Sequence, residues 1–440
     1  MEQEPKKEQR LAFIDIARSI AILMMLEGHF IVMSLQDKFR SDDYFIYSIW
    51  KFTRGFTAPL FFTVSGLVFT YLLVRKNKPF FHNERVRKGL KRGVQLLFWG
   101  YFLQVNLYYL LQGYFSGYLF IFHVLQCIGL SLIIIIVFSG IQSLVRFIPL
   151  SLWLGIVGFL GFILRPTIYS LDFSGVHPII ENILVVASDD RPFKSIFALF
   201  PWVGFVAFGG MMGAYLSVHA AKVYTNRYVL ILFLTGLILN IFPGVLLKMI
   251  QPYFMFLGLK PFAHMGYLFA RLGQVFLAFS LIIFIGIYKP YFKHIFSTKL
   301  VVFQTWVIPI TSAILGLSII AYSYLTGSQY HIFSTLTLYA FGNLLLFIAL
   351  VYTLAKLIPW NFELFLKMGQ KTLSIYIIHV IILYGGIFGF GLSDFLSSKL
   401  HPWGSVIGAM LFMTLFVYFI KYYEFFDNYY QKIFFWKKKD

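Results

Sequence analysis

The sequence predicts an all-α polytopic membrane protein, a bundle of about twelve transmembrane helices (10–12) with both termini in the cytoplasm. Of its 440 residues, 59% are hydrophobic, 20% are aromatic and 12% are charged, so polar groups cannot cover the apolar surface in water. Apolar runs of about 20 residues, enough to cross roughly 30 Å of hydrocarbon, recur along the whole length. None alternates with a period of two, as the strands of a membrane barrel would.

The predicted spans form one transmembrane domain over residues 1–440, without a soluble domain or a Gly/Ser linker. Their ends are expected to be accurate to about three residues. In chain order the spans are 11–34, 49–73, 93–112, 118–138, 149–166, 196–217, 228–248, 264–288, 300–322, 333–357, 371–391 and 404–424.

The placement of Lys and Arg predicts the orientation. Five basic segments fall on one predicted side of the bundle, and the positive-inside rule makes that side cytoplasmic. They are 1–10, 75–92, 218–227, 289–299 and 425–440, of which the first and last are basic cytoplasmic tails. The longest connection on the opposite side, 167–195, is less basic and faces away from the cytoplasm.

Composition also excludes several functional classes. The formal net charge of +19 comes from loops between spans, so membrane lipid is the expected partner and no nucleic acid is predicted. The single cysteine, Cys127, permits neither an intramolecular disulfide nor a Cys-based metal site, and no metal is predicted. Motifs of soluble hydrolases, P-loop proteins and dinucleotide-binding enzymes are missing from the sequence. Candidate chemistry therefore lies in ionisable residues within the spans, where they are costly without a role or a partner.

The first span contains four such residues: Asp15, Arg18, Glu27 and His29. At 100° per residue, Arg18 and His29 lie about 20° apart around the helix axis, and Asp15 lies about 60° from Arg18. Glu27 points to a different face. The polar stripe makes Asp15, Arg18 and His29 candidate catalytic residues, while a structural ion pair near the inner interface is the alternative for Asp15 and Arg18.

Polar residues on other spans are expected at the depth of His29, roughly 9 Å below the outer surface. Arg54 in the second span, His123 at the start of the fourth and Arg271 in the eighth indicate a cavity that opens outward. For His123 and Arg271, an interhelical hydrogen bond or snorkelling is the alternative. His379 in the eleventh span is expected about 10 Å from the inner surface, with a structural hydrogen bond as its alternative role.

Two segments resemble the opening of a known family. RLAFIDIARSIAILMMLEGHF at 10–30, followed by TRGFTAPLFFTVSGLVF at 53–69, is similar to the start of the heparan-α-glucosaminide N-acetyltransferase-like family, within the wider group of transmembrane acyltransferases. Less specific similarities extend over most of the chain. They are VLQCIGLSL at 124–132, which makes Gln126 a further candidate, FPWVGFVAFGGMMGAYL at 200–216 and MGQKTLSIYIIH at 368–379.

The resemblance implies a transmembrane acyltransferase of a bacterial inner membrane. It would move an acetyl or other short acyl group from cytoplasmic acyl-CoA to a sugar of an envelope glycan or glycolipid on the far side. Carried over to this sequence, the D-x-x-R element is Asp15 and Arg18, and His29 occupies the place of the first-helix histidine. The outer loop 36–48 contains no histidine. The oligomeric state is open between a monomer and a homodimer.

A basic inner segment suits the phosphates of CoA, although anionic lipid would be attracted by the same charges. Its candidate residues are Arg85, Arg87, Lys88, Lys91 and Arg92. His29 would deprotonate the acceptor, and Arg54 or a backbone N–H would stabilise the oxyanion. An acyl-imidazole formed on His29 is the competing route.

A twelve-helix secondary transporter of a small solute or glycan precursor is the alternative function, because it shares midplane ionisable residues and Gly/Pro-interrupted helices. The polar residues here concentrate in the first four spans, and the later spans do not repeat the opening motif. This asymmetry favours the enzyme.

Overall fold

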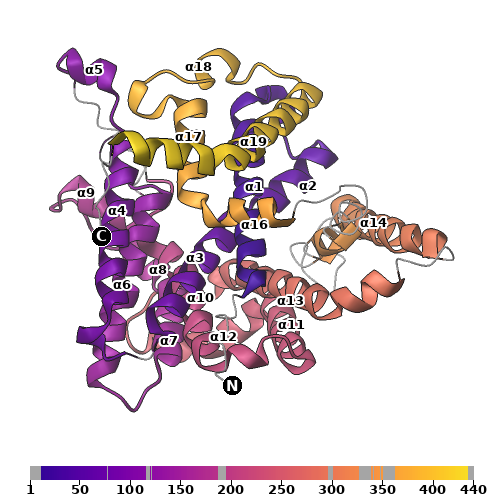
Figure 1. The fold of residues 1–440 in the computed structure, drawn as a ribbon. Coiled ribbons are helices and arrows are strands. Elements are labelled where there is room, and N and C mark those ends of the chain that lie inside the picture. Colours follow the sequence, from indigo (N-terminus) through magenta and orange to yellow (C-terminus); the bar gives the residue numbers. More distant parts are fainter. Residues whose placement is uncertain are drawn as a thin grey trace, which may run out of the picture.

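The computed structural model describes residues 11–76, 78–114, 119, 121–186, 195–295, 301–326, 338–339, 341–346, 348–349 and 362–434. Figure 1 shows that these residues form a helical bundle. In this part of the chain the regular structure is helical, and an isolated β-bridge joins Leu35 to Leu400. The all-α fold predicted from composition is confirmed.

Among the described residues, seven helices are long and apolar enough to cross a bilayer, which confirms an integral membrane protein. They comprise α1 (Ala12–Ser34), α2 (Phe45–Arg54) continued by α3 (Thr57–Val74), α6 (Val124–Leu144), α10 (Leu199–His219), α13 (Gly266–Ile295), α14 (Val301–Thr326) and α19 (Pro402–Phe434). Two bent pairs raise this number to as many as nine: α11 (Asn226–Ile241) with α12 (Pro243–Met255), and α16 (Phe362–Gln370) with α17 (Thr372–Tyr384). The shorter helices are α4 (Glu84–Phe102), α5 (Leu107–Leu111), α7 (Leu150–Ile163), α8 (Arg165–Tyr169), α9 (Pro178–Leu184) and α18 (Ser393–Leu396).

The predicted span 93–112 differs from the structure. Helix α4 begins earlier, after the cap residue Asn83, whose side-chain oxygen accepts a hydrogen bond from the Arg85 N–H at 2.9 Å. It ends at Phe102, and a turn separates it from α5. Most of the basic residues before the predicted span therefore belong to the first half of α4. The apolar run 93–112 is divided between the second half of α4 and α5.

Two more predicted spans are bent. The span 228–248 breaks before Pro243, where α11 and α12 meet at 75°, because proline lacks an N–H and starts a helix more readily than it continues one. The span 371–391 is helical to Tyr384 and meets α16 at a bend of 76°. Most of 333–357 lies outside the described residues, so the total of twelve spans stays a prediction.

The described parts of the basic segments lie at one end of the bundle. Helices α3 and α10 run parallel, so the segments 75–92 and 218–227 that follow them begin at the same end. The Tyr288 hydroxyl donates to Asn226 Oδ1 at 3.3 Å, which brings the start of 289–299 there too. Lys371, next to the start of α1, lies 4.1 Å from the ring centroid of Tyr423. The packing thus agrees with the grouping predicted from charge, and the assignment of this end to the cytoplasm stays a prediction.

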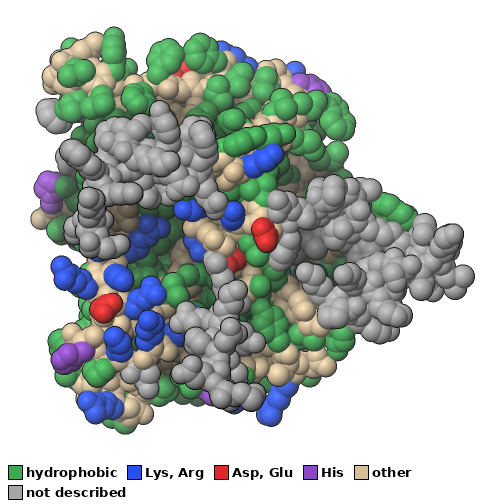
Figure 2. Space-filling model, in the orientation of Figure 1, with side chains coloured by type: hydrophobic (Ala, Val, Ile, Leu, Met, Phe, Trp, Pro, Cys, Tyr) green, Lys and Arg blue, Asp and Glu red, His purple; other side chains and the backbone are tan. Residues whose placement is uncertain are grey.

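The surface is suited to lipid. Hydrophobic side chains occupy much of the face drawn in Figure 2, whereas Lys and Arg gather in one region of it, at the lower left. Large apolar side chains that are more than half exposed include Val94, Phe98, Leu152, Ile231 and Leu411. An aqueous protein would bury such a set, so lipid is the expected neighbour of this surface.

Candidate functional site

Two histidines meet inside the bundle. His29 comes from the second half of α1, and His379 comes from the middle of α17. His29 Nδ1 and His379 Nε2 are 3.2 Å apart, within hydrogen-bonding distance, and their ring centroids are 5.1 Å apart. His379 is fully buried and His29 is half-buried. The pair therefore has one enclosed member and one that a substrate can reach.

The bend between α16 and α17 explains this meeting. Ser19 Oγ donates to the carbonyl oxygen of Phe365 and accepts from the N–H of Gly369 at 3.0 Å, which holds α16 against α1. Helix α17 then starts beside Arg18, part of the way along α1. The predicted separation in depth between His379 and His29 is therefore wrong.

Asp15 and Arg18 lie at the other end of the polar stripe. Arg18 Nη1 is 3.9 Å from Asp15 Oδ1, and Arg18 Nη2 donates to Thr372 Oγ1 at 3.0 Å. Along α1, Arg18 is separated from His29 by roughly 16 Å of helix rise. These contacts place both residues at the junction of α1 with α17, which favours the structural interpretation of the ion pair.

Arg54 and Glu27 border the histidine pair on the side of α2. Glu27 Oε1 accepts a hydrogen bond from Trp50 Nε1 at 2.5 Å, which agrees with the predicted placement of Glu27 on a separate face. Arg54 crosses α1 at Gly28, where an added Cβ would lie 3.5 Å from its Nε. The charge of Arg54 is near enough to act on both Glu27 and His29. An exposed cation is thus held beside the accessible histidine.

A tyrosine at the end of α17 completes this site. The ring centroid of Tyr384 is 6.0 Å from that of His29, and Tyr384 is exposed. Helix α17 ends at Gly385, whose φ of 78° is accessible to glycine without strain. Sequence reasoning missed both Tyr384 and the pairing of the histidines. A signal was present in the resembling segment 368–379, which ends on His379.

Arg271 makes the interhelical hydrogen bond that was the alternative to a role in the site. Its Nη1 donates to the carbonyl oxygen of Phe52 at 3.1 Å and to Gln274 Oε1 at 3.0 Å. A Cβ at Gly55 would lie 2.8 Å from Arg271 Nη2, so the glycine makes room for the guanidinium. Arg271 therefore satisfies a carbonyl at the C-terminal end of α2 and compensates its negative pole. It supports the helix that carries Arg54 rather than His29 itself.

His123 and Gln126 belong to another part of the bundle. His123 is the residue before α6, and Gln126, one turn into that helix, is fully buried against Gly100 of α4. Neither makes a hydrogen bond or ring contact with His29 among the described residues. Of the four polar groups expected at one level, the structure brings His29 and Arg54 together, while Arg271 acts through the backbone of α2.

The five basic candidates occupy the first half of α4. Arg87, Lys88 and Lys91 are exposed, and Arg85 and Arg92 are half-buried. Lys88 Nζ is 4.0 Å from a carboxylate oxygen of Glu84, a long contact between exposed groups, and Arg92 Nη1 donates to Gln95 Oε1 at 3.1 Å. One weak ion pair leaves most of this positive charge able to bind phosphate, so the residues fit the anionic end of acyl-CoA.

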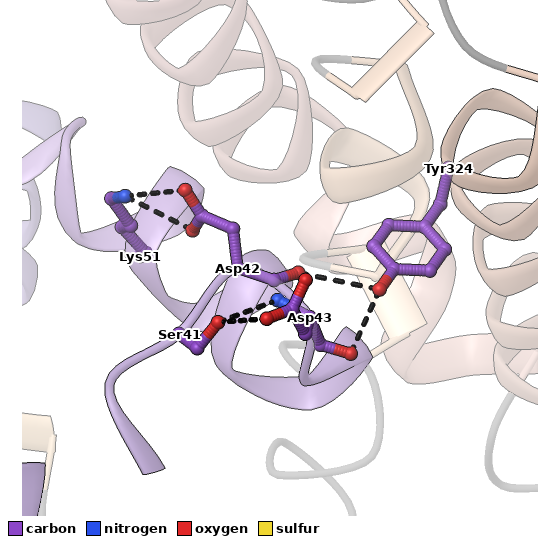
Figure 3. Close-up of polar contacts among 5 residues, drawn as sticks. All are labelled: Ser41, Asp42, Asp43, Lys51 and Tyr324. Atoms are coloured by element: carbon purple, nitrogen blue, oxygen red, sulfur yellow. Dashed lines mark hydrogen bonds and ion pairs between the residues drawn. The ribbon is translucent and has the colours of Figure 1, made fainter. Parts of the chain in front are cut away.

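A polar network holds the loop before α2 (Figure 3). Lys51 Nζ is 2.7 Å from Asp42 Oδ2, and the hydroxyl of Tyr324 in α14 donates to the carbonyl oxygen of Asp43 at 2.8 Å. Ser41 Oγ donates to Asp43 Oδ2 at 2.5 Å. The network ties the N-terminal end of α2 to α14 and thereby helps to fix the helix that presents the site cation.

The arrangement can perform acid–base chemistry. An imidazole side chain can take up a proton in its neutral form and release it again as imidazolium near neutral pH. A nearby guanidinium stabilises a developing negative charge. Within the described part of the chain, no group of three His, Cys, Asp or Glu side chains could hold a metal ion. In this site, His29 can transfer a proton and Arg54 can stabilise a negative charge.

Comparison with known proteins assigns the family. A family model described as "Heparan-alpha-glucosaminide N-acetyltransferase, catalytic" matches residues 10–236, which include His29, Arg54 and the basic half of α4 but not α17. Searches of curated proteins and of solved structures give no match. The matched range exceeds half of the chain. The protein therefore belongs to the heparan-α-glucosaminide N-acetyltransferase family and is a membrane-embedded acetyltransferase.

Proposed function

We propose that this protein transfers an acetyl or other short acyl group from cytoplasmic acyl-CoA to a sugar hydroxyl or amine on the far side of the membrane. The observation that supports this most directly is the place of His29 and Arg54. They lie near the end of α1 opposite to the basic segments, so a donor bound at one end and an acceptor at the other could meet across the bundle.

The donor would bind through its phosphates to the basic half of α4. Arg87, Lys88 and Lys91 are exposed on this helix and bind anions without giving up a strong ion pair. The neutral pantetheine arm is thin and would carry the thioester into the bundle. Anionic lipid headgroups would compete for the same charges, so tight donor binding requires contacts beyond α4.

His29 acts on the acceptor. Its imidazole takes the proton from the sugar O–H or N–H while the oxygen or nitrogen attacks the thioester carbonyl carbon. The carbonyl oxygen gains negative charge, and the guanidinium of Arg54 stabilises it. When the carbon–sulfur bond breaks, the thiolate leaves and takes the proton back from His29. The ester or amide product and free CoA thiol balance the reaction.

Transfer of labelled acetyl from acetyl-CoA in proteoliposomes tests this function. His29→Ala should abolish transfer while the purified protein keeps its unfolding temperature. His219→Ala is a matched control, because His219 is a half-buried histidine, like His29, but lies at the end of α10. Wild-type transfer by His29→Ala would remove His29 from the mechanism.

The same assay without acceptor separates the two routes. Direct transfer predicts no label on the protein, whereas the acyl-imidazole route predicts label that depends on His29. Stable incorporation of acetyl into wild type but not into His29→Ala would therefore replace the direct step with the covalent one.

A further inference from the structure

We propose that His379 is a positioning residue, which holds His29 in the tautomer that carries hydrogen on Nδ1 and leaves the Nε2 lone pair free to accept the proton of the acceptor. This inference rests on the proposed function and adds a residue that lies outside the range matched by the family model.

The backbone of α17 determines the tautomer of His379. Its Nδ1 is 3.3 Å from the carbonyl oxygen of Ile375, one turn earlier in the helix. A carbonyl oxygen only accepts hydrogen bonds, so Nδ1 must carry the hydrogen. Because His379 is fully buried, water is not available as another partner. In the neutral ring, Nε2 is then an acceptor.

The tautomer of His29 follows from that of His379. His29 Nδ1 faces His379 Nε2 at 3.2 Å, and two lone pairs would repel at this distance. A hydrogen on His29 Nδ1 makes the contact a hydrogen bond. Protonation of His379 would also supply a hydrogen, but it would place a positive charge at a fully buried position, away from water, and is therefore unfavourable.

The remaining nitrogen of His29 is free for chemistry. No described residue forms a hydrogen bond with His29 Nε2, and the ring is half-buried rather than enclosed. A neutral imidazole with hydrogen on Nδ1 has its basic lone pair on Nε2. The carbonyl-to-His379-to-His29 chain thus selects which nitrogen a substrate meets, in the way that a buried hydrogen-bond acceptor orients the histidine of a catalytic triad.

Nuclear magnetic resonance of ¹⁵N-histidine-labelled protein in lipid bilayers tests the tautomer directly. In wild type we expect His29 with a protonated Nδ1 and an unprotonated Nε2, its signals assigned by their loss in His29→Asn. In His379→Phe, which keeps a ring of similar size but removes the acceptor, we expect a mixture of both tautomers. A wild-type His29 with hydrogen on Nε2, or no change in His379→Phe, would overturn the inference.

Kinetics distinguish positioning from a merely structural role. His379→Phe should lower kcat roughly 10- to 100-fold, the range for loss of an orienting partner, with KM for acetyl-CoA within about twofold. His379→Gln restores a side-chain acceptor and should recover part of both kcat and the tautomer preference. Leu383→Ala is the control, because it removes a fully buried apolar side chain of the same helix that cannot form a hydrogen bond with His29. It should lower stability and leave the tautomer unchanged.

The two proposals can fail separately. A correct tautomer in wild type without acetyl transfer to any sugar acceptor would refute the proposed function and leave the positioning intact. Full kcat in folded His379→Phe, together with active wild type, would refute the positioning and leave the function.

Discussion

Gly369→Ala should break the hydrogen bond between His29 and His379, although Gly369 contacts neither histidine in the structure. Gly369 lies at the end of α16, just before the bend, and a Cβ there would lie 2.6 Å from Ser19 Oγ and closer still to the carbonyl oxygen of Asp15. Real contacts of this kind are at least 3.0 Å, so α16 must move away from α1 or the Ser19 hydroxyl must rotate. A carbonyl in a helix cannot rotate in this way, and we therefore expect α16 to move by about 0.5–1 Å.

This shift has a calculable effect on the site. His29 Nδ1 and His379 Nε2 are 3.2 Å apart. A shift of about 0.5–1 Å transmitted along α17 would lengthen this distance beyond about 3.6 Å, at which a hydrogen bond is lost. A misplacement of about 1 Å costs an enzyme up to roughly 100-fold in rate. Overpacking should also lower the free energy of unfolding by about 1–3 kcal/mol.

Single-turnover acetyl transfer and thermal unfolding, measured on the same preparations, check both effects. Gly404→Ala is the control, because its Cβ would come no nearer than 3.7 Å to another residue, at Leu400. We expect Gly369→Ala to lose rate with unchanged acetyl-CoA binding. A variant that is destabilised but turns over at the wild-type rate would show that the contact of α16 with α1 does not control the histidines.

Three further predictions concern the cation, the donor site and the helix packing. Arg54→Gln should lower kcat about 100- to 1,000-fold in steady-state assays, since it removes the charge opposite the oxyanion; an unchanged kcat would contradict this role. Replacing Arg87, Lys88 and Lys91 together with Gln should raise KM for acetyl-CoA and weaken the salt dependence of KM. The control Arg146→Gln, which changes an exposed arginine elsewhere, should do neither. An unchanged KM in the triple variant would exclude this part of α4 from donor binding. Gly66→Ala should lower the free energy of unfolding by about 1–3 kcal/mol in denaturation, because its Cβ would overlap the Val206 carbonyl; wild-type stability would contradict the close packing of α3 on α10.

Part of the site could be predicted because its signals are local. The polar stripe of α1 depends on the period of one helix, and His29 and Glu27 point in the directions that this period gives. Arg54 could be predicted because it is an ionisable residue within an apolar segment that is close in sequence to α1. Such patterns act over about 20 residues, and a single sequence shows them without an alignment.

The remainder depended on contacts that no local pattern encodes. The sequence left Arg271 open between a role in the site and an interhelical hydrogen bond, and the structure shows the hydrogen bond, to the carbonyl oxygen of Phe52, a residue 219 positions away. The role of Asp15 and Arg18 was likewise ambiguous until Thr372 was found beside them. Spacing gives the depth of a residue only when its helix starts at a membrane surface, and α17 starts beside Arg18, part of the way along α1.

The sequence by itself determined that this is a helical membrane protein and that its opening helices resemble those of a membrane acetyltransferase. It also predicted that the basic segments lie at one end. Hydropathy and charge are properties of individual residues, so the predictions that depend on them can be made without knowledge of the fold. Only the tertiary structure decided that His379 is the partner of His29, 350 positions away in the chain. That pairing depends on the bend after α16 and on its packing against Ser19, and a bend angle is set by contacts between helices rather than by the hydropathy of either one.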